Sequence, residues 1–297
     1  MRKSVQLFSS KKVAPYVFTA PFVITFIVFF LYPTISTIIM SFQRIVPGEA
    51  KFVGFENYRI LFDKTFYKAV SNTVVFTFWS VFILVTLPIL LSVLVNYSIT
   101  KFKNPLKMFI FLPAVVSTVV GGVIFRQIFG ELDTSFMNSI LSKFSIPPQQ
   151  WTMKSSTGML LMVLLAVWRW TGVNMLYFMA GLQNIPNELY ESADIDGANW
   201  PHKFLHITLP SLQPVIVFVV LISVSAGLKM FEESYVFWQG SSPMNIGLTI
   251  LGYIYREGIS FGNLGLGSAA GLILLMMILI VSVIQLKYFG LLGKEEQ

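Results

Sequence analysis

The stretch LGSAAGLILLMMILIVSVIQLKY, residues 266–288, decides the class of fold. Its one charged side chain at neutral pH, that of Lys287, stands next to its end. A helix needs roughly 20 apolar residues to cross the hydrocarbon core of a bilayer, which is about 30 Å thick. The stretch therefore predicts a membrane-spanning helix.

Further apolar runs of the same kind precede it and extend the prediction to six spans. Hydrophobic residues make up 55% of the chain, charged residues make up 12%, and the mean hydropathy is +0.72. The charged share is about half that of a soluble domain. We therefore expect an all-α polytopic membrane protein with a single transmembrane domain over residues 1–297. The other five spans are predicted near residues 14–40, 70–99, 106–129, 157–182 and 205–229.

Prolines interrupt some of these runs. Pro33, Pro88 and Pro113 lie inside their runs or near the ends. Because proline has no backbone N–H, each frees a carbonyl that a neighbouring helix has to satisfy within the bilayer. Kinks are therefore expected. The first outer loop, near residues 41–69, is rich in aromatic residues and predicts an amphipathic helix at the interface.

The charges predict an orientation and exclude several classes of site. The net charge of +7 comes from basic residues scattered between apolar runs, which favours lipid headgroups over nucleic acid as their partners. Residues 1–13 and 100–107 are basic without acids, so we expect both termini and the loop 183–204 to be cytoplasmic in a cell-membrane protein. There is no cysteine, and His202 and His206 have no evident further ligand, so no metal site is predicted.

Chemistry that would make the chain an enzyme or a self-sufficient pump is absent from the sequence. There is no G-x-x-x-x-G-K-S/T loop for a nucleotide and no G-x-S-x-G elbow for a nucleophile. No pair of carboxylates lies within the apolar runs, as a proton relay would require. If the chain takes part in uphill transport of a solute, we expect the energy to enter from another polypeptide, and a stand-alone secondary carrier stays open as the alternative.

The loop 183–204 predicts a helix–turn–helix elbow. A short helix is expected over residues 186–195, with Glu188 at its positive N-terminal end. Gly197 permits a left-handed turn after it. Asn199 can cap a second short helix that has Pro201 near its start. The elbow leads directly into the fifth predicted span.

The same loop resembles a known family motif. Glu191-Ser-Ala-Asp-Ile-Asp-Gly-Ala198 followed by Ile207-Thr-Leu-Pro210 resembles the EAA loop of ABC importer permeases, in the version typical of the carbohydrate branch. The sequence departs from the pattern at Ser192, where the family usually has alanine. The matching positions are Glu191, Ala193, Asp196, Gly197, Ala198, Ile207, Leu209 and Pro210.

The resemblance covers nearly the whole chain. It includes Pro15-Tyr16, Tyr32-Pro33, residues 52–58, Phe111-Leu-Pro113 and residues 168–174, and it is nearest to arabino-oligosaccharide permeases of Gram-positive bacteria. It implies a type I ABC importer permease fold and the import of a carbohydrate, with an oligosaccharide as the expected substrate, through a pathway of which this chain forms half. It also implies a second, different permease, a cytoplasmic ATPase dimer that carries ATP and Mg, and an extracellular sugar-binding protein, with no cofactor on this chain.

Arg169 is a charge near the middle of the fourth predicted span, between Trp168 and Trp170, and these three residues are candidates for the substrate pathway. Such a charge is costly in a membrane and faces protein or a water-filled path. Two interpretations stay open: it hydrogen-bonds sugar hydroxyls, or it pairs with Glu232, Glu233 or backbone carbonyls.

Three further polar residues are candidates for the pathway. Asn174 is a candidate polar wall residue, although it does not share the face of Arg169 closely. Glu232 and Glu233 mark the outer end of the fifth span, as a gate or as a solvated helix end. Gly121-Gly122 and the Gly267–Gly271 pair predict close helix packing.

Overall fold

The computed structural model describes residues 13–97, 103–239 and 242–290. Residues 1–12 and Lys101, on which the predicted orientation partly rests, lie outside these ranges. The contacts divide the chain into two compact units. One contains Met1–Phe62 and Ile254–Ile273, and the other contains Asp63–Tyr253 and Leu274–Gln297. The single domain over residues 1–297 stays a prediction.

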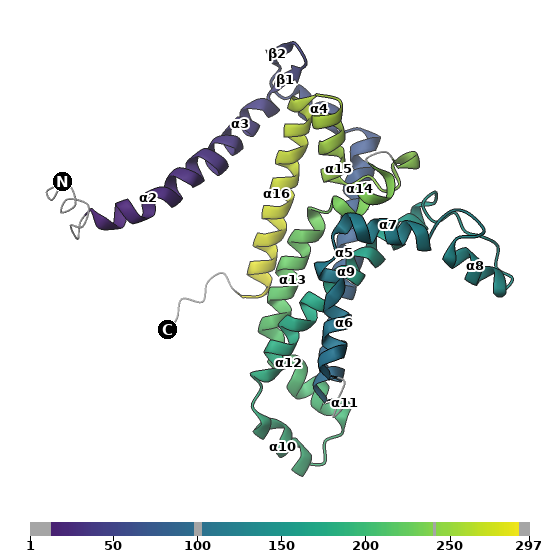
Figure 1. Cartoon of the computed structure of the whole chain (residues 1–297). Coiled ribbons are helices and arrows are strands. Elements are labelled where there is room, and N and C mark those ends of the chain that lie inside the picture. Colours follow the sequence, from purple (N-terminus) through teal and green to yellow (C-terminus); the bar gives the residue numbers. More distant parts are fainter. Residues whose placement is uncertain (1–12, 98–102, 240–241, 291–297) are drawn as a thin grey trace, which may run out of the picture. The chain divides into compact units, whose positions relative to one another are not determined.

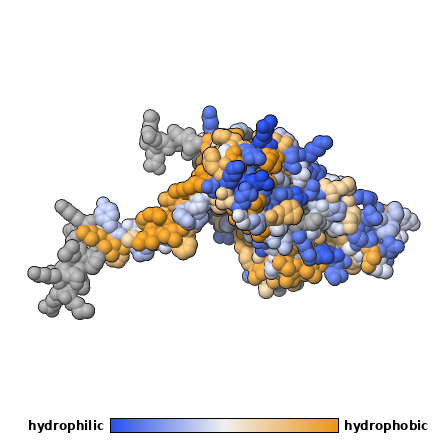
Figure 2. Space-filling view, turned by 90° about the horizontal axis from the view of Figure 1, so that it is seen from above, coloured by the Kyte–Doolittle hydropathy of each residue, from blue (hydrophilic) through white to orange (hydrophobic). Residues whose placement is uncertain are grey.

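The first unit begins with one long apolar helical run. It consists of α2 (Ala14–Phe26), the π-helix η1 (Ile27–Leu31) and α3 (Tyr32–Ser41). None of its most apolar window is buried. Figure 2 shows apolar side chains along the surface of this run. The apolar side chains of this run are therefore not covered by other described parts of the chain.

The first outer loop forms a hairpin and a short helix. Strands β1 (Gln43–Val46) and β2 (Glu49–Phe52) pair antiparallel, and α4 (Glu56–Leu61) follows them. Nδ2 of Asn57 donates to the carbonyls of Ser41 and Gln43, at 2.8 and 2.9 Å, and ties α4 to the hairpin. The prediction of an amphipathic helix was wrong for the hairpin, because Gly48, at φ +86°, permits a tight turn there.

The remainder of this unit is the π-helix η4 (Tyr255–Ser260) and the first part of α16 (Leu264–Tyr288). They approach closely, since a Cβ atom on Gly267 would lie 2.8 Å from Cα of Gly258. The predicted packing role is confirmed for Gly267. A Cβ atom on Gly271 would meet nothing within 4 Å.

The second unit is a helical bundle built around α9 (Ser155–Gln183). The helices α5 (Lys64–Tyr97), α6 (Lys103–Val115) and α13 (Gln213–Leu228) pack against it. A Cβ atom on Gly172 of α9 would collide with the backbone of Ile110 and Phe111 in α6, so only glycine allows this crossing.

Short elements lie at the two ends of this bundle (Figure 1). At one end are α10 (Asn187–Ile195) and α11 (Trp200–Lys203), and α14 (Glu232–Trp238) and α15 (Ile250–Ile254) are at the other. The remaining elements are α7 (Thr118–Ile128), α8 (Phe136–Lys143), the π-helix η2 (Phe204–Thr208), α12 (Leu209–Ser211), the 3₁₀-helix η3 (Pro243–Asn245) and the second part of α16.

Six spans are consistent with the described residues. Five helices are long and apolar enough to cross a membrane, and one bent pair supplies a sixth span. The bent pair is the predicted run 106–129, in which α6 and α7 meet at 101°. The chain turns at Ser117, which is extended at φ −57° and ψ 139°. The bend therefore comes four residues after Pro113.

The fifth predicted span, residues 205–229, begins too early. Its end agrees with the end of α13 at Leu228, and the stretch that is apolar enough to cross a membrane continues through α14 to Trp238. Pro214 stands in the first turn of α13, where its missing N–H costs nothing and a helix readily begins. Residues 204–211 belong instead to η2 and α12.

Candidate functional site

The elbow has the predicted local structure. Helix α10 ends at Ile195, and Gly197 follows in the left-handed region at φ +72°. The N–H of Ala198 donates to the carbonyl of Ala193 at 2.8 Å, and that of Gly197 donates to Asp194 at 3.1 Å. These two bonds form a Schellman motif, which closes the helix and reverses the chain.

The second arm of the elbow begins with the predicted cap. Oδ1 of Asn199 accepts from the N–H of His202 at 3.1 Å. Lys203 in this arm forms an ion pair with Asp194 in α10. The two arms are thus joined by the turn and by a side-chain pair.

Apolar contacts anchor the elbow to the bundle. Ile207 packs against a buried cluster that contains Val93, Leu182 and Leu212. Leu209 packs against a second cluster, which includes Phe178. Ile207 and Leu209, two of the residues that match the EAA pattern, therefore anchor the elbow to the core of the bundle.

The tip of the elbow faces outward. Glu191, Ser192, Asp196, Gly197 and Pro210 are exposed, and Ala193 and Ala198 are half-buried. Three large apolar side chains are also exposed on this end: Ile195 at 88%, Leu189 at 46% and Trp200 at 45%. A rigid element with an exposed apolar tip can transmit the movement of a partner to the helices behind it.

A cavity of about 600 Å³ lies within the second unit. Five predicted pathway residues line it: Arg169, Trp170, Asn174, Glu232 and Glu233. Aromatic rings and small hydroxyls complete the wall, including Phe76, Tyr177, Phe231, Ser80 and Ser223. The cavity therefore combines apolar faces with a few hydrogen-bonding groups, as ligand sites generally do.

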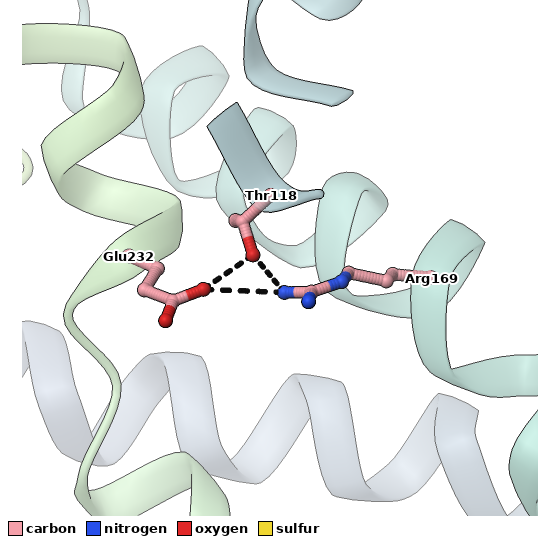
Figure 3. A network of polar contacts seen from close by, with 3 residues as sticks. All are labelled: Thr118, Arg169 and Glu232. Atoms are coloured by element: carbon pink, nitrogen blue, oxygen red, sulfur yellow. Dashed lines mark hydrogen bonds and ion pairs between the residues drawn. The ribbon is translucent and has the colours of Figure 1, made fainter. Parts of the chain in front are cut away.

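Three polar side chains form a network at the wall of the cavity (Figure 3). Nη1 of Arg169 lies 3.3 Å from Oε2 of Glu232 and also donates to the hydroxyl of Thr118. The Thr118 hydroxyl donates in turn to Oε2 of Glu232. The interpretation in which Arg169 pairs with Glu232 is confirmed.

Glycines bring this network together. A Cβ atom on Gly122 would collide with Val236, so glycine lets α7 approach α14 and places Thr118 beside Glu232. A Cβ atom on Gly121 would lie 3.1 Å from the ring of Trp168. The predicted packing role of both glycines is confirmed.

Trp168 differs from the other pathway candidates. It packs against the apolar core, with its ring centroid 5.7 Å from that of Phe125, and it is not among the residues that line the cavity. Trp170, two positions on, does line the cavity, and the guanidinium carbon of Arg169 lies 5.2 Å from its ring centroid.

Asn174 has a structural partner. Its Nδ2 donates to the carbonyl of Leu84 at 2.8 Å. That carbonyl would ordinarily accept from the residue four positions on, but Pro88 has no N–H. The prediction that a neighbouring helix satisfies a carbonyl freed by proline is confirmed here.

Thr118 was not predicted as a member of the network. The available signal was a pair of hydroxyl residues, Ser117-Thr118, inside an apolar run shortly after Pro113. Among the described residues, no three His, Asp or Glu side chains come together as a metal site would require. His202 and His206 stack on each other, with 4.0 Å between ring centroids.

A helical bundle with a bent span, a polar cavity and an exposed elbow defines a polytopic transport permease. The sequence matches the family model described as "Binding-protein-dependent transport system inner membrane component" over residues 60–289. The chain therefore belongs to this family, whose members are permease subunits and not enzymes.

Individual relatives agree with this assignment. The arabinooligosaccharides transport system permease protein AraP of Bacillus subtilis (strain 168) is 58% identical, over 96% of this chain and 91% of that protein. A protein of the same name from Halalkalibacterium halodurans is 48% identical, over 100% and 95%. The lactose transport system permease protein LacF of Rhizobium radiobacter is 32% identical, over 91% and 92%.

A solved structure shares the fold. A chain of a bacterial ABC transporter involved in the import of the acidic polysaccharide alginate superposes with a TM-score of 0.85, covering 95% of this chain and 96% of that chain at 23% identity. The resemblance to ABC importer permeases and the type I fold predicted from the motifs are confirmed.

Proposed function

We propose that this chain imports an arabino-oligosaccharide across the cell membrane as one of two different permeases. The observation that carries the proposal is the 58% identity to an arabinooligosaccharide permease over nearly the full length. In this proposal, a cytoplasmic ATPase dimer binds ATP and Mg, and an extracellular sugar-binding protein delivers the substrate.

The chemistry of the cavity supports a carbohydrate substrate. Sugars present apolar C–H faces and many hydroxyl groups. The rings of Trp170, Tyr177 and Phe231 offer apolar faces, and Ser80 and Ser223 offer hydroxyls. The volume of about 600 Å³ is within the usual range for small-molecule sites.

The exposed tip of the elbow supports coupling to the ATPase. Ile195, Leu189 and Trp200 leave apolar surface exposed next to the left-handed turn at Gly197. An ATPase surface that covered these side chains would remove them from water, and its closure would push a rigid elbow. In this proposal, Glu191 through Ala198 contact the ATPase, whereas Ile207 and Leu209 transmit the movement to the bundle.

The proposed orientation places the elbow in the cytoplasm together with both termini. The elbow lies at the end of the second unit opposite α14 and α15 (Figure 1). The basic segments of the sequence support this direction, because positive residues favour the cytoplasmic side. Glu232 and the cavity wall near it would then face the external side.

Reconstitution in liposomes tests the function. The complete assembly should take up labelled arabinotriose when both ATP inside and the binding protein outside are supplied. Omitting either component should abolish uptake. Uptake of the sugar by this chain alone, without ATP, would overturn the proposal in favour of a secondary carrier.

A further inference from the structure

Arg169 is a half-buried cation that has a carboxylate partner in the wall of the cavity. Its side chain is 17% exposed, whereas that of Glu232 is 64% exposed. Glu232 engages only Nη1 of the guanidinium group. Nε of Arg169 is buried and has no acceptor among the described residues.

Four charged residues line the cavity: Arg169, Lys229, Glu232 and Glu233. Among them, the structure joins Arg169 and Glu232 in an ion pair. The negative charge of Glu232 therefore already faces Nη1 of the guanidinium group, and it repels a second carboxylate at that place.

We infer that Glu232 determines specificity: as the internal counter-ion of Arg169, it makes the cavity select uncharged saccharides over saccharides that carry a carboxylate. This inference rests on the proposed function, because it concerns the same cavity and names the substrate class. A carboxylate on the sugar would compete with Glu232 for Nη1 of Arg169 and be repelled by it. An uncharged sugar neither competes with Glu232 for the charge of Arg169 nor is repelled by Glu232.

The geometry of the guanidinium group predicts what removal of the counter-ion does. Arginine pairs best with a carboxylate through two parallel N–H donors. Glu232→Gln removes the negative charge, so a carboxylate of the ligand can take both donors of Arg169. Arg169→Gln should act in the opposite direction, since it leaves the negative charge of Glu232 unopposed.

Two ligands that differ by one carboxylate test the inference. Arabinotriose and its aldonic acid, arabinotrionate, have the same chain length. Binding of each is measured by equilibrium dialysis to the solubilised assembly of this chain with its permease partner and ATPase. The sugar-binding protein is left out, so that its own specificity does not enter the result. Glu49→Gln, in the exposed strand β2, serves as the matched control.

The wild type and the Glu49→Gln control should prefer arabinotriose about tenfold or more. Glu232→Gln should reduce this preference by about tenfold, because the variant binds arabinotrionate more tightly than the wild type does. This increase in affinity should become smaller at high salt. Arg169→Gln should widen the preference. The double variant should lie near the wild type, because both charges are removed together.

The failure of the inference and the failure of the proposed function look different. If the wild type binds arabinotriose and Glu232→Gln leaves the preference unchanged, the specificity role of Glu232 is overturned, and the sugar site stands. If the wild type binds neither compound, the cavity is not the sugar site and the inference is overturned, whereas the proposed function is decided by the uptake measurement in liposomes. Should Glu232→Gln not assemble, an unchanged preference in Arg169→Gln would overturn the inference equally.

Discussion

The elbow and the wall of the cavity differ in the sequence separation of the residues that form them. The elbow is specified by neighbours in sequence: Gly197 turns the chain, and Asn199 caps the helix three residues before His202. The cavity wall is specified by residues far apart: Arg169 meets Glu232 across 63 positions, and Asn174 meets Leu84 across 90. A substitution in the elbow can therefore alter the turn without disturbing the bundle, whereas a substitution in the wall of the cavity affects several helices at once.

The largest expected effect is the loss of coupling in Gly197→Val. A β-branched residue is strained at φ +72°, so the turn has to change and the two arms of the elbow reorient. We expect sugar-stimulated ATPase activity of the reconstituted assembly to fall by tenfold or more, with membrane insertion intact.

Gly48→Val is the matched control for this variant. Gly48 has φ +86°, and, like Gly197, it has open space around the position of a Cβ atom. Both variants carry a similar backbone strain, but Gly48 lies in the hairpin and not in the elbow. Equal loss of stimulated activity in the two variants would mean that strain itself, and not the elbow, causes the defect.

An intermediate effect is expected at the wall of the cavity in Asn174→Ala. The carbonyl of Leu84 loses the donor that Asn174 supplies, and a buried unpaired polar group costs about 1–3 kcal/mol. The midpoint of thermal unfolding of the purified assembly should fall accordingly.

A second substitution distinguishes this cause from a simple loss of packing. Pro88→Ala restores an N–H four residues after Leu84, so the helix can satisfy the carbonyl itself. In the Asn174→Ala background, this change should recover most of the lost stability. Without recovery, the bond to Leu84 is not what Asn174 contributes.

The smallest expected effect is that of Asn199→Ala in the elbow. Losing a side-chain cap costs about 1 kcal/mol, and the helix it caps is short. Hydrogen exchange of the amide of His202, measured by mass spectrometry, should increase, whereas sugar-stimulated ATPase activity should fall less than threefold. Ser117→Ala is the control, because Ser117 occupies the same position before α7 without a side-chain cap bond. Equal exchange in both variants would contradict a role for the cap.

The same contrast explains what the sequence could predict. Proline, glycine and asparagine act on adjacent residues, so the end of α10 at Ile195 and the turn at Gly197 could be predicted from the loop alone. The bend at Ser117 could not, because an apolar run of that length is equally compatible with one straight span. The bend results from the extended backbone conformation of Ser117, and the sequence around Ser117 restricts this conformation only weakly.

The cavity shows the limit for contacts between helices. The sequence offered Glu232 as one of several partners for Arg169 but gave no register between α9 and α14. Thr118 entered the network because Gly122 lets two helices approach. Trp168 and Trp170 looked equivalent in the sequence, and only the packing of α9 sends the first to the core and the second to the cavity.

The exposed apolar run of α2, η1 and α3 affects the stability of the chain before it assembles with other subunits. A helix with none of its apolar window buried gains little from the folding of its own chain. Its place in the membrane is then set by its surroundings, and a neighbouring protein that packs against it stabilises it by mass action. A chain made in excess of its neighbours would leave this helix packed against lipid alone.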